Sequence, residues 1–288
     1  MMLMLQASVG QGGQNQADDV KFVRALLNVV RRKQGDTPLA VDGSAGQELA
    51  AAIARFQVAH GVSVASGLIK PASHSWQWLL DSLDASRTLQ PIVPPGRGRL
   101  TWEAEGQEGG RYHSRVLQVP SAASGLRVGR GYDLRLRSRV EASRDLAAAG
   151  VESAKALQIA GAVHLQGDAA WQFIIAEDLL DYEISPEVQL RLFELVYRAA
   201  ADEVQKICAR SDMVSSYGPT HWPTLDSRIQ DVLVDLYVRG DYTGANSHQV
   251  QPPVVANDVA GLAAVMASKT LWSGVPPERR LRRHGYLK

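Results

Sequence analysis

Three glutamates lie close together in the stretch WEAEGQEGGRYHSR, residues 102–115, ahead of a tyrosine and a histidine. A carboxyl group can donate a proton near neutral pH when partial burial against apolar or aromatic surface keeps it protonated. Glu105 meets this requirement best, because a tryptophan precedes it and a glycine follows it. Glu103 and Glu108 are expected to be surface charges, with Glu108 as a reserve acid.

Asp133 is the natural second carboxylate. It lies near the end of a short β-like run, GLRVGRGYDL, whose glycines would let a sugar chain lie close to the backbone. Cleavage of a glycosidic bond needs one carboxylic acid to protonate the leaving oxygen and a second carboxylate to activate water or attack the sugar. The two carboxyl groups are ~6.5–9.5 Å apart in inverting enzymes and ~5–5.5 Å apart in retaining ones, and the sequence leaves this outcome open.

Other catalytic chemistries lack their characteristic residues. The seven histidines are scattered and Cys208 is the only cysteine, so neither a zinc site nor an internal disulfide is predicted. No G-x-S-x-G nucleophile motif occurs, and the GRG of residues 129–131 lacks the Lys-Ser/Thr that grips phosphate. We therefore expect no metal and no cofactor, and we expect Cys208 to be a small core residue on a helix.

Composition indicates an ordinary globular protein. Hydrophobic residues make up 45% of the 288 and charged residues 21%, with a formal net charge of +1. This balance gives no reason to expect nucleic acid or a membrane as a partner. The first ten residues, MMLMLQASVG, lack the features of a signal peptide, and no ~18-residue apolar run predicts a membrane span. Synthesis in the cytoplasm without a classical leader is expected.

A linker divides the chain. Residues 84–100, DASRTLQPIVPPGRGRL, contain three prolines and two glycines and show no helical periodicity. We predict one domain over residues 1–84, a linker over 85–98 and a second domain over 99–288.

The first domain is predicted to be a unit of three short helices separated by glycine turns at Asp42-Gly43 and Ser66-Gly67. The apolar positions expected in its core are Val20, Val23, Leu26, Leu27, Val30, Leu49, Ile53, Phe56, Trp76 and either Leu79 or Leu80.

The second domain is predicted to be mainly helical. Ser185 and Pro186 form a strong helix start as N-cap and first helical residue. By contrast, residues 100–135 are rich in glycine and contain the β-like run. We expect a functional site in this extended segment, which leads into the helices. The helical segments are expected within residues 138–150, 151–167, 167–182, 185–210, 225–240 and 257–272.

The order of pieces in the first domain resembles the peptidoglycan-binding-type domain found on many cell-wall hydrolases. The matching stretches are SVGQGGQNQADDVKFVRALLN, VDGSAGQELAAAIARFQ, SGLIKP and SWQWL. The resemblance implies that this domain holds the wall polymer. Its substrate-binding positions would then include Asp42, Gly43, Phe56 and Gln57. The alternative is that the Asp42-Gly43 and Ser66-Gly67 pairs only make turns.

The second domain resembles the pesticin-type branch of phage-lysozyme-like muramidases. The resemblance lies in EAEG, SGLRVGRGYDL and ISPEVQLRLFELVY, and more faintly in RRLRRHGYL near the C-terminus. It implies an α+β lysozyme-like fold, with the family's general-acid glutamate on Glu105 and its aspartate on Asp133. The family's threonine, which helps to hold the attacking water, falls on Arg127.

Arg127 is a departure from that pattern, because an arginine cannot accept a hydrogen bond from water. Either Asp133 positions water alone, or Ser124 or Tyr132 substitutes, or catalysis is weak. Arg127 could also keep Asp133 ionised.

Two further groups of residues have two interpretations each. Tyr112 and His113 could line a sugar subsite or could be packing residues. The arginine run 279–283 is expected to be a solvated face, and otherwise a contact for the anionic wall or for an acidic partner.

The resemblances together predict a peptidoglycan hydrolase, a muramidase that cleaves the β-1,4 bond between N-acetylmuramic acid and N-acetylglucosamine. They suggest a secreted antibacterial toxin that acts in the periplasm and cell wall of a target cell, with a cognate immunity protein and a secretion-system carrier as partners. The alternatives are a catalytically inactive peptidoglycan-binding protein, a phage-type endolysin and a wall amidase.

Overall fold

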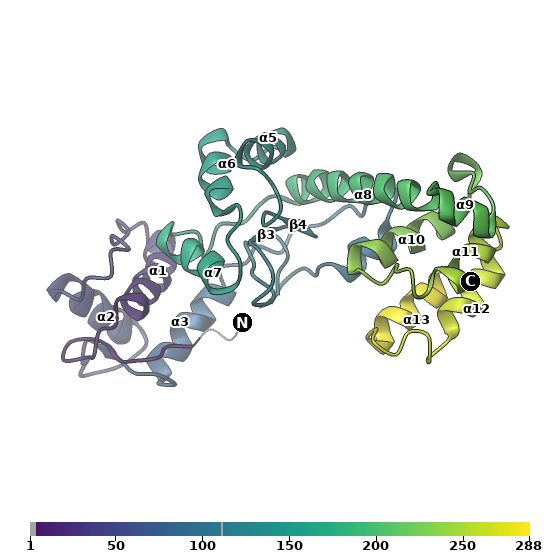
Figure 1. Ribbon diagram of the computed structural model, residues 1–288. Helices are drawn as coiled ribbons and strands as arrows, with labels where there is room; N and C mark the ends of the chain where they lie inside the picture. The colour runs from purple at the N-terminus through teal and green to yellow at the C-terminus, as the bar shows by residue number, and fades with distance from the viewer. Residues whose placement is uncertain (1–3, 111) are drawn as a thin grey trace. The chain divides into compact units, whose positions relative to one another are not determined.

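A computed structural model describes residues 4–110 and 112–288 (Figure 1). Within these residues the chain is mainly helical and has two small sheets, each of two antiparallel strands. The prediction of a mainly helical fold is confirmed. Among the helices of this described part, none combines the length and the apolar character needed to cross a membrane, as the sequence predicted.

Contacts between residues divide the chain into two units. Unit 1 contains Met1–Pro91 and Gln107–Gln189, and unit 2 contains Ile92–Gly106 and Leu190–Lys288. Unit 1 thus contains the predicted first domain together with part of the predicted second one. The first division falls inside the predicted linker, and the domain boundaries at residues 84 and 99 stay a prediction. Each unit is described by itself below.

Unit 1 contains both sheets and most of the shorter helices. Its elements are β1 (Val9–Gly10), α1 (Ala17–Gln34), α2 (Gln47–Ala59), β2 (Leu68–Ile69), α3 (His74–Asp84), β3 (Arg127–Val128), β4 (Tyr132–Asp133), α5 (Arg139–Ala149), α6 (Ser153–Ile159), the 3-10 helix η1 (Ala160–Ala162), α7 (Gly167–Ala176) and the first residues of α8 (Pro186–Cys208).

The three predicted N-terminal helices are present as α1, α2 and α3, and the apolar stripes explain them. Most of the predicted core positions are at most 5% exposed, because each helix turns its apolar face inward. Val30 and Leu80 are the two that remain partly exposed. A left-handed glycine, Gly35 at φ 77°, ends α1, and its N–H donates to the last carbonyls of the helix.

Helix α1 also packs against α7, more than a hundred residues further along the chain (Figure 1). Phe22 and Trp171 meet edge to face, with ring centroids 5.9 Å apart. At the other end of α1, Arg32 forms ion pairs of 2.6 Å with Asp178 and 2.5 Å with Asp181. Apolar and ionic contacts therefore join residues 1–91 to residues 107–189 within unit 1.

The predicted segments around the glycine-rich region are confirmed with one change. The β-like run forms the hairpin of β3 and β4, and α5 ends at Gly150 as predicted. Ser185 accepts a hydrogen bond from the N–H of Val188, which makes it the N-cap of α8. The predicted helix over 151–167 is shorter, because α6 tightens into η1 and His164 takes a positive φ of 67°.

Unit 2 is entirely helical in its regular elements. These are α4 (Arg99–Ala104), the rest of α8, α9 (Ser211–Tyr217), the 3-10 helix η2 (Trp222–Thr224), α10 (Ser227–Arg239), α11 (Ser247–Val255), α12 (Val259–Ala267) and α13 (Pro277–Tyr286). Its apolar core draws on α4, α8, α10, α11 and α12, including Phe193, Leu233 and Met266. Cys208 is buried in this core, as predicted.

The ends of the predicted linker, residues 85–98, are both fastened. In unit 1 the N–H of Thr88 donates to Glu183 at 3.0 Å. In unit 2 the N–H of Gly98 donates to the buried Asp231 at 3.2 Å. The proline-rich composition therefore marks a segment without helix, but hydrogen bonds to each unit hold its ends.

A buried carboxylate organises the C-terminal end of unit 2. Asp235 is 0% exposed, and it accepts hydrogen bonds of 2.6 Å from both Arg279 and Arg283. Arg280 is also buried and donates to the carbonyl of Ala267 at 2.9 Å. The prediction that the run 279–283 is a solvated face is wrong, because the helical spacing turns these three arginines toward acceptors on α10 and α12.

Asp235→Ala should destabilise the protein by ~3–5 kcal/mol, because the buried guanidinium of Arg283 loses one of its two carboxylates and keeps Asp241. Urea unfolding followed by circular dichroism measures the change. Asp212→Ala is the matched control, since its ion pair with Arg210 is exposed and should contribute at most ~1 kcal/mol. Equal stability of the two variants would contradict this account of the arginine run.

Candidate active site

The hairpin of β3 and β4 places Asp133 opposite Arg127 in the antiparallel register. The connecting turn has Gly129 at φ 64° and Gly131 at φ 93°, in the left-handed region that favours glycine. The GRG motif is thus the turn of the hairpin. It brings the two predicted site residues of this segment side by side.

Backbone groups hold the Asp133 carboxylate in place. The N–H of Arg135 donates to Oδ1 at 2.8 Å, and the N–H of Gly125 donates to Oδ2 at 3.3 Å. Arg127 Nε lies 3.6 Å from Oδ2, and the Asp133 side chain is 28% exposed. A Cβ atom on Gly125 would lie 2.4 Å from Asp133 Oδ1, so this position requires glycine. The carboxylate is therefore fixed in position and still reachable from solvent.

A cavity of about 360 Å³ lies beside Asp133. Small-molecule sites usually have volumes of ~300–1,000 Å³, so this cavity falls within their range. Its lining combines charge with one apolar side chain. The lining residues are Gly131, Asp133, Arg135, Leu136, Arg137 and Glu141.

Two predicted substrate-binding residues of this segment have structural partners. Tyr132 is buried, its hydroxyl donates to Asp145 at 2.9 Å, and the guanidinium of Arg137 stacks 4.0 Å from its ring centre. Burial, together with the bond to Asp145, raises the pKa of Tyr132, so its phenol stays protonated. The Ser124 carbonyl accepts from the N–H of Gly167 at 2.9 Å. Both residues support the hairpin, while neither lines the cavity beside Asp133.

Glu105 lies in unit 2, at the C-terminal end of α4. Its side chain is only 12% exposed, and Arg279 Nη1 donates to Oε1 at 2.8 Å. Its neighbour Trp102 is buried and meets Phe193 edge to face, with centroids 5.1 Å apart. Partial burial beside an aromatic residue is the setting that the sequence predicted for this glutamate. Glu105 and Asp133 thus fall in different units.

Arg279 links Glu105 to the buried carboxylate of unit 2. Its Nη2 donates to Asp235 at 2.6 Å while its Nη1 holds Glu105. Although burial alone would lower the pKa of Arg279, its hydrogen bonds and ion pairs with the two carboxylates raise it. The side chain of Glu105 is thus oriented by a permanently charged group that is itself fixed.

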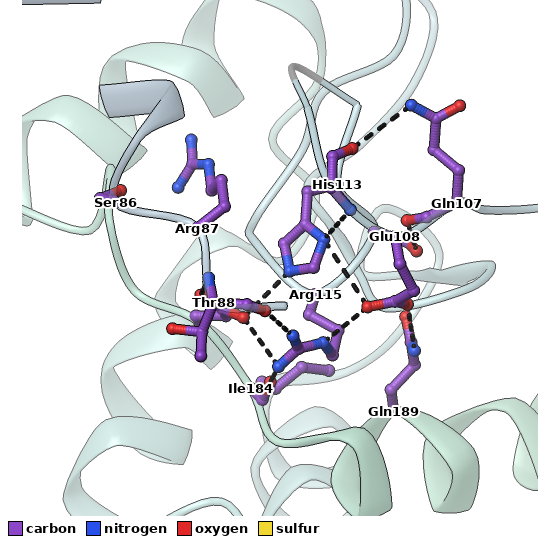
Figure 2. A network of polar contacts seen from close by, with 12 residues as sticks. Ser86, Arg87, Thr88, Gln107, Glu108, His113, Arg115, Ile184 and Gln189 are labelled. Atoms are coloured by element: carbon purple, nitrogen blue, oxygen red, sulfur yellow. Dashed lines mark hydrogen bonds and ion pairs between the residues drawn. The ribbon is translucent and has the colours of Figure 1, made fainter. Parts of the chain in front are cut away.

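Glu108 belongs to a network of polar contacts in unit 1 (Figure 2). Its side chain is 17% exposed, and it accepts from Arg115 at 2.8 Å, Gln189 at 3.0 Å and Arg130 at 3.2 Å. Burial alone would raise the pKa of Glu108, but these hydrogen bonds outweigh it and lower the pKa. The prediction that Glu108 is a surface charge is wrong. An ionised carboxylate held in this way does not suit the role of reserve acid.

His113 is fully buried in the same network (Figure 2). Its Nδ1 accepts a hydrogen bond of 2.7 Å from the N–H of Gly109, and its Nε2 lies 3.0 Å from Glu183 Oε1. Because Nδ1 is an acceptor, we assign a neutral ring whose Nε2–H donates to Glu183. This arrangement favours the packing interpretation of His113 over a sugar subsite.

Tyr112, in contrast, is 69% exposed. It borders a separate cavity of about 180 Å³ in unit 1, together with Arg87 and Trp171. The sugar-subsite interpretation of Tyr112 stays a prediction, on a surface different from the lining of the Asp133 cavity.

The predicted wall-binding positions of residues 1–84 mostly have partners within the fold. Gln57 is buried, and its amide bonds the Gly67 N–H, the Leu68 carbonyl and the Ser75 hydroxyl, which ties α2 to the second turn and to α3.

The first turn and the aromatic position are also explained by packing and local hydrogen bonds. Phe56 is buried in α2. The Asp42 carboxylate accepts hydrogen bonds from the N–H and from the hydroxyl of Ser44. The bond from the N–H contributes most to lowering the pKa of Asp42, followed by the bond from the hydroxyl. Gly43 has a positive φ of 79°. These contacts favour the interpretation of Asp42-Gly43 as a turn, and wall binding by these residues stays a prediction.

Several residues of these sites have no signal in the sequence. Arg115 is 1% exposed and pairs with both Glu108 and Glu183, yet it follows the glutamate stretch as an ordinary basic residue. Arg279 could have been found from its i, i+4 spacing to Arg283 on an amphipathic helix. Within residues 4–110 and 112–288, no cluster of histidine, cysteine and acidic side chains is suited to a metal ion.

Glu108→Gln should destabilise the protein by about 3 kcal/mol at neutral pH, because Arg115 and Arg130 would lose a shared carboxylate. The lowered pKa of Glu108 means that its contribution is fully present above the ordinary value of 4.5. It is lost as the pH falls through the lowered value of the folded state. Urea unfolding of both proteins should give a constant difference between about pH 6 and 8 and a shrinking one below 4.5.

Glu103→Gln is the control for this measurement, because Glu103 is 47% exposed and, among the described residues, pairs with the exposed Arg99 alone. Its effect should stay within ~0.5 kcal/mol at every pH. A Glu108→Gln difference that grows as the pH falls would contradict the assignment of an ionised Glu108.

Comparison with known proteins gives one family. Residues 98–284 match the family described as Domain of unknown function (DUF8812). No curated protein matches the chain. Because the match covers more than half of the sequence, the protein belongs to the DUF8812 family.

Proposed function

We propose that the protein is a peptidoglycan muramidase that hydrolyses the β-1,4 bond between N-acetylmuramic acid and N-acetylglucosamine. The observation that carries the proposal is the Asp133 carboxylate, fixed by two backbone N–H groups beside a cavity of about 360 Å³. It lies in the segment SGLRVGRGYDL, which resembles the pesticin-type muramidases. In the same proposal, the second domain is lysozyme-like and the first is a peptidoglycan-binding-type domain.

Asp133 acts as the general base in this mechanism. An ionised carboxylate has about four acceptor sites on its two oxygens, and two backbone donors with Arg127 leave capacity for a water molecule. Fixed donors keep the carboxylate in one orientation, so the water that it activates is held in one place. The Ser124 hydroxyl bonds the Ser121 hydroxyl at 2.8 Å and the Tyr132 hydroxyl donates to Asp145, which favours Asp133 holding the water alone.

Glu105 acts as the general acid. Its partial burial supports this role, because a sugar bound over it would remove the remaining solvent. Arg279 fixes the direction of the carboxyl group through Oε1, and the acid role requires this ion pair to loosen when Glu105 carries its proton. In glycosidases generally, the separation between the acid and the second carboxylate determines whether the reaction inverts or retains the configuration.

The first domain would hold the wall polymer and so raise the concentration of substrate around the catalytic domain. We further propose that the protein is an antibacterial toxin delivered to the periplasm of a target cell. A producing cell would then carry a cognate immunity protein.

A catalytically inactive wall-binding protein is the second candidate, and Arg127 favours it. The guanidinium lies 3.6 Å from Asp133, at the position where the related muramidases have a water-holding threonine. If Arg127 displaces the attacking water, the protein would bind peptidoglycan without cutting it.

Glu105→Gln and Asp133→Asn should each reduce the release of soluble muropeptides by ~10²–10⁴-fold, because each removes a proton-transfer group. The loss of turbidity of purified peptidoglycan measures the rate. Glu103→Gln is the matched control, two residues away and exposed, and should keep the wild-type rate. Thermal unfolding checks that all variants are folded.

Full activity in Glu105→Gln would refute the assigned acid. A wild-type protein that sediments with peptidoglycan but releases nothing would support the inactive candidate, and Arg127→Thr would then be expected to restore release. Release of stem peptides alone would point to an amidase instead.

A further inference from the structure

The side-chain charge of Arg135 has no partner among the residues that the structure describes. Its backbone is fully used, since the N–H donates to Asp133 at 2.8 Å and the carbonyl lies 3.1 Å from His164 Nδ1. The guanidinium, however, makes no hydrogen bond or ion pair with any described residue, and its Nε atom is shielded from solvent. Shielded polar groups are nearly always paired in folded proteins, so an unpaired one needs an explanation.

The other charges around the Asp133 cavity are already compensated. Arg137 pairs with Glu141 at 2.6 Å and approaches Asp145 at 3.6 Å, and its guanidinium stacks on Tyr132. Asp133 has two backbone donors and an ion pair with Arg127. Arg135 is therefore the one cation in the described lining of this cavity without an internal partner.

The hairpin fixes where this cation lies. Gly125 passes so close that a Cβ atom on it would lie 2.7 Å from the Arg135 Cβ atom. The next residue, Leu136, also lines the cavity although it is 84% exposed. A charged donor and an apolar side chain thus lie next to each other beside the proposed catalytic base. This pairing suits a ligand that carries an anionic group next to apolar atoms.

We propose that Arg135 binds a carboxylate of the peptidoglycan strand and so selects strands that carry this charge. The inference rests on the proposed muramidase function. A guanidinium binds a carboxylate through two parallel hydrogen bonds, which sets its geometry as well as its charge. The carboxylate can come from the stem peptide or, on strands without peptide, from the lactyl group of the muramic acid. The methyl group of lactyl or alanine would meet Leu136.

The test compares peptidoglycan with the same material after its carboxyl groups are converted to neutral amides. On intact material, Arg135→Gln should raise KM by ~10–100-fold and leave kcat nearly unchanged, because it removes a binding contact that takes no part in proton transfer. On amidated material, the wild type should show the same raised KM, and Arg135→Gln should add nothing further. Arg135→Lys should lie between the two.

Arg139→Gln is the matched control, because it removes the same charge from an exposed residue at the start of α5 that does not line the cavity. It should keep the wild-type KM. Strands stripped of peptide by an amidase distinguish the two sources of carboxylate. Retention of the Arg135 effect there assigns the lactyl group, and its loss assigns the stem peptide.

Two results would overturn the inference while leaving the muramidase proposal intact. One is an active wild type whose KM does not change on amidation of the substrate. This measurement uses the wild-type protein alone and so does not depend on the folding of a variant. The other is an Arg135→Gln variant that loses as much on amidated as on intact material. Absence of muropeptide release by the wild type from any of these substrates would refute the muramidase proposal itself, and the inference with it.

Discussion

Asp235 has no exposure to water, and its negative charge therefore has to be balanced inside unit 2. Arg283 and Arg279 supply that balance from α13, and Arg279 extends the chain of charges to Glu105 at the end of α4. Removing Asp235 would leave Arg279 with Glu105 and Arg283 with Asp241, so each guanidinium would lose one of its two carboxylates. The position of the proposed acid thus depends on a carboxylate that never touches substrate, which explains why α13 is rich in arginine.

The two proposed catalytic carboxyl groups are held in different ways. Side chains orient Glu105, whereas backbone N–H groups orient Asp133 inside a tight hairpin. A backbone N–H can donate to Asp133 only where the main chain passes close to its carboxylate. Position 125 therefore needs glycine, because a Cβ atom there would collide with the Asp133 carboxylate. The same hairpin fixes the backbone of Arg135, while the guanidinium of this residue has no partner among the described residues.

Local patterns in the sequence predicted much of the fold. The apolar stripe of α1, the helix within residues 225–240, the Ser185-Pro186 start of α8 and the hairpin over 125–134 are all present, because each depends on neighbouring residues. Helix α11 was missed because it contains Pro252 and Pro253, which normally argue against a helix.

The charged contacts of the sites could not be predicted in the same way. The burial of Glu108, His113 and Arg283 depends on partners 22 to 81 residues away, and a local pattern carries no information about them. The sequence of a basic run, or of a glutamate next to glycines, is the same whether these side chains face solvent or a buried residue of opposite charge.

The most direct test of the muramidase proposal is to identify the new chain ends after digestion of purified peptidoglycan, by borohydride reduction and mass spectrometry. The proposal predicts reduced N-acetylmuramic acid at the ends of the released fragments with wild-type protein and not with Asp133→Asn. Fragments without such ends, or the release of peptides alone, would contradict it.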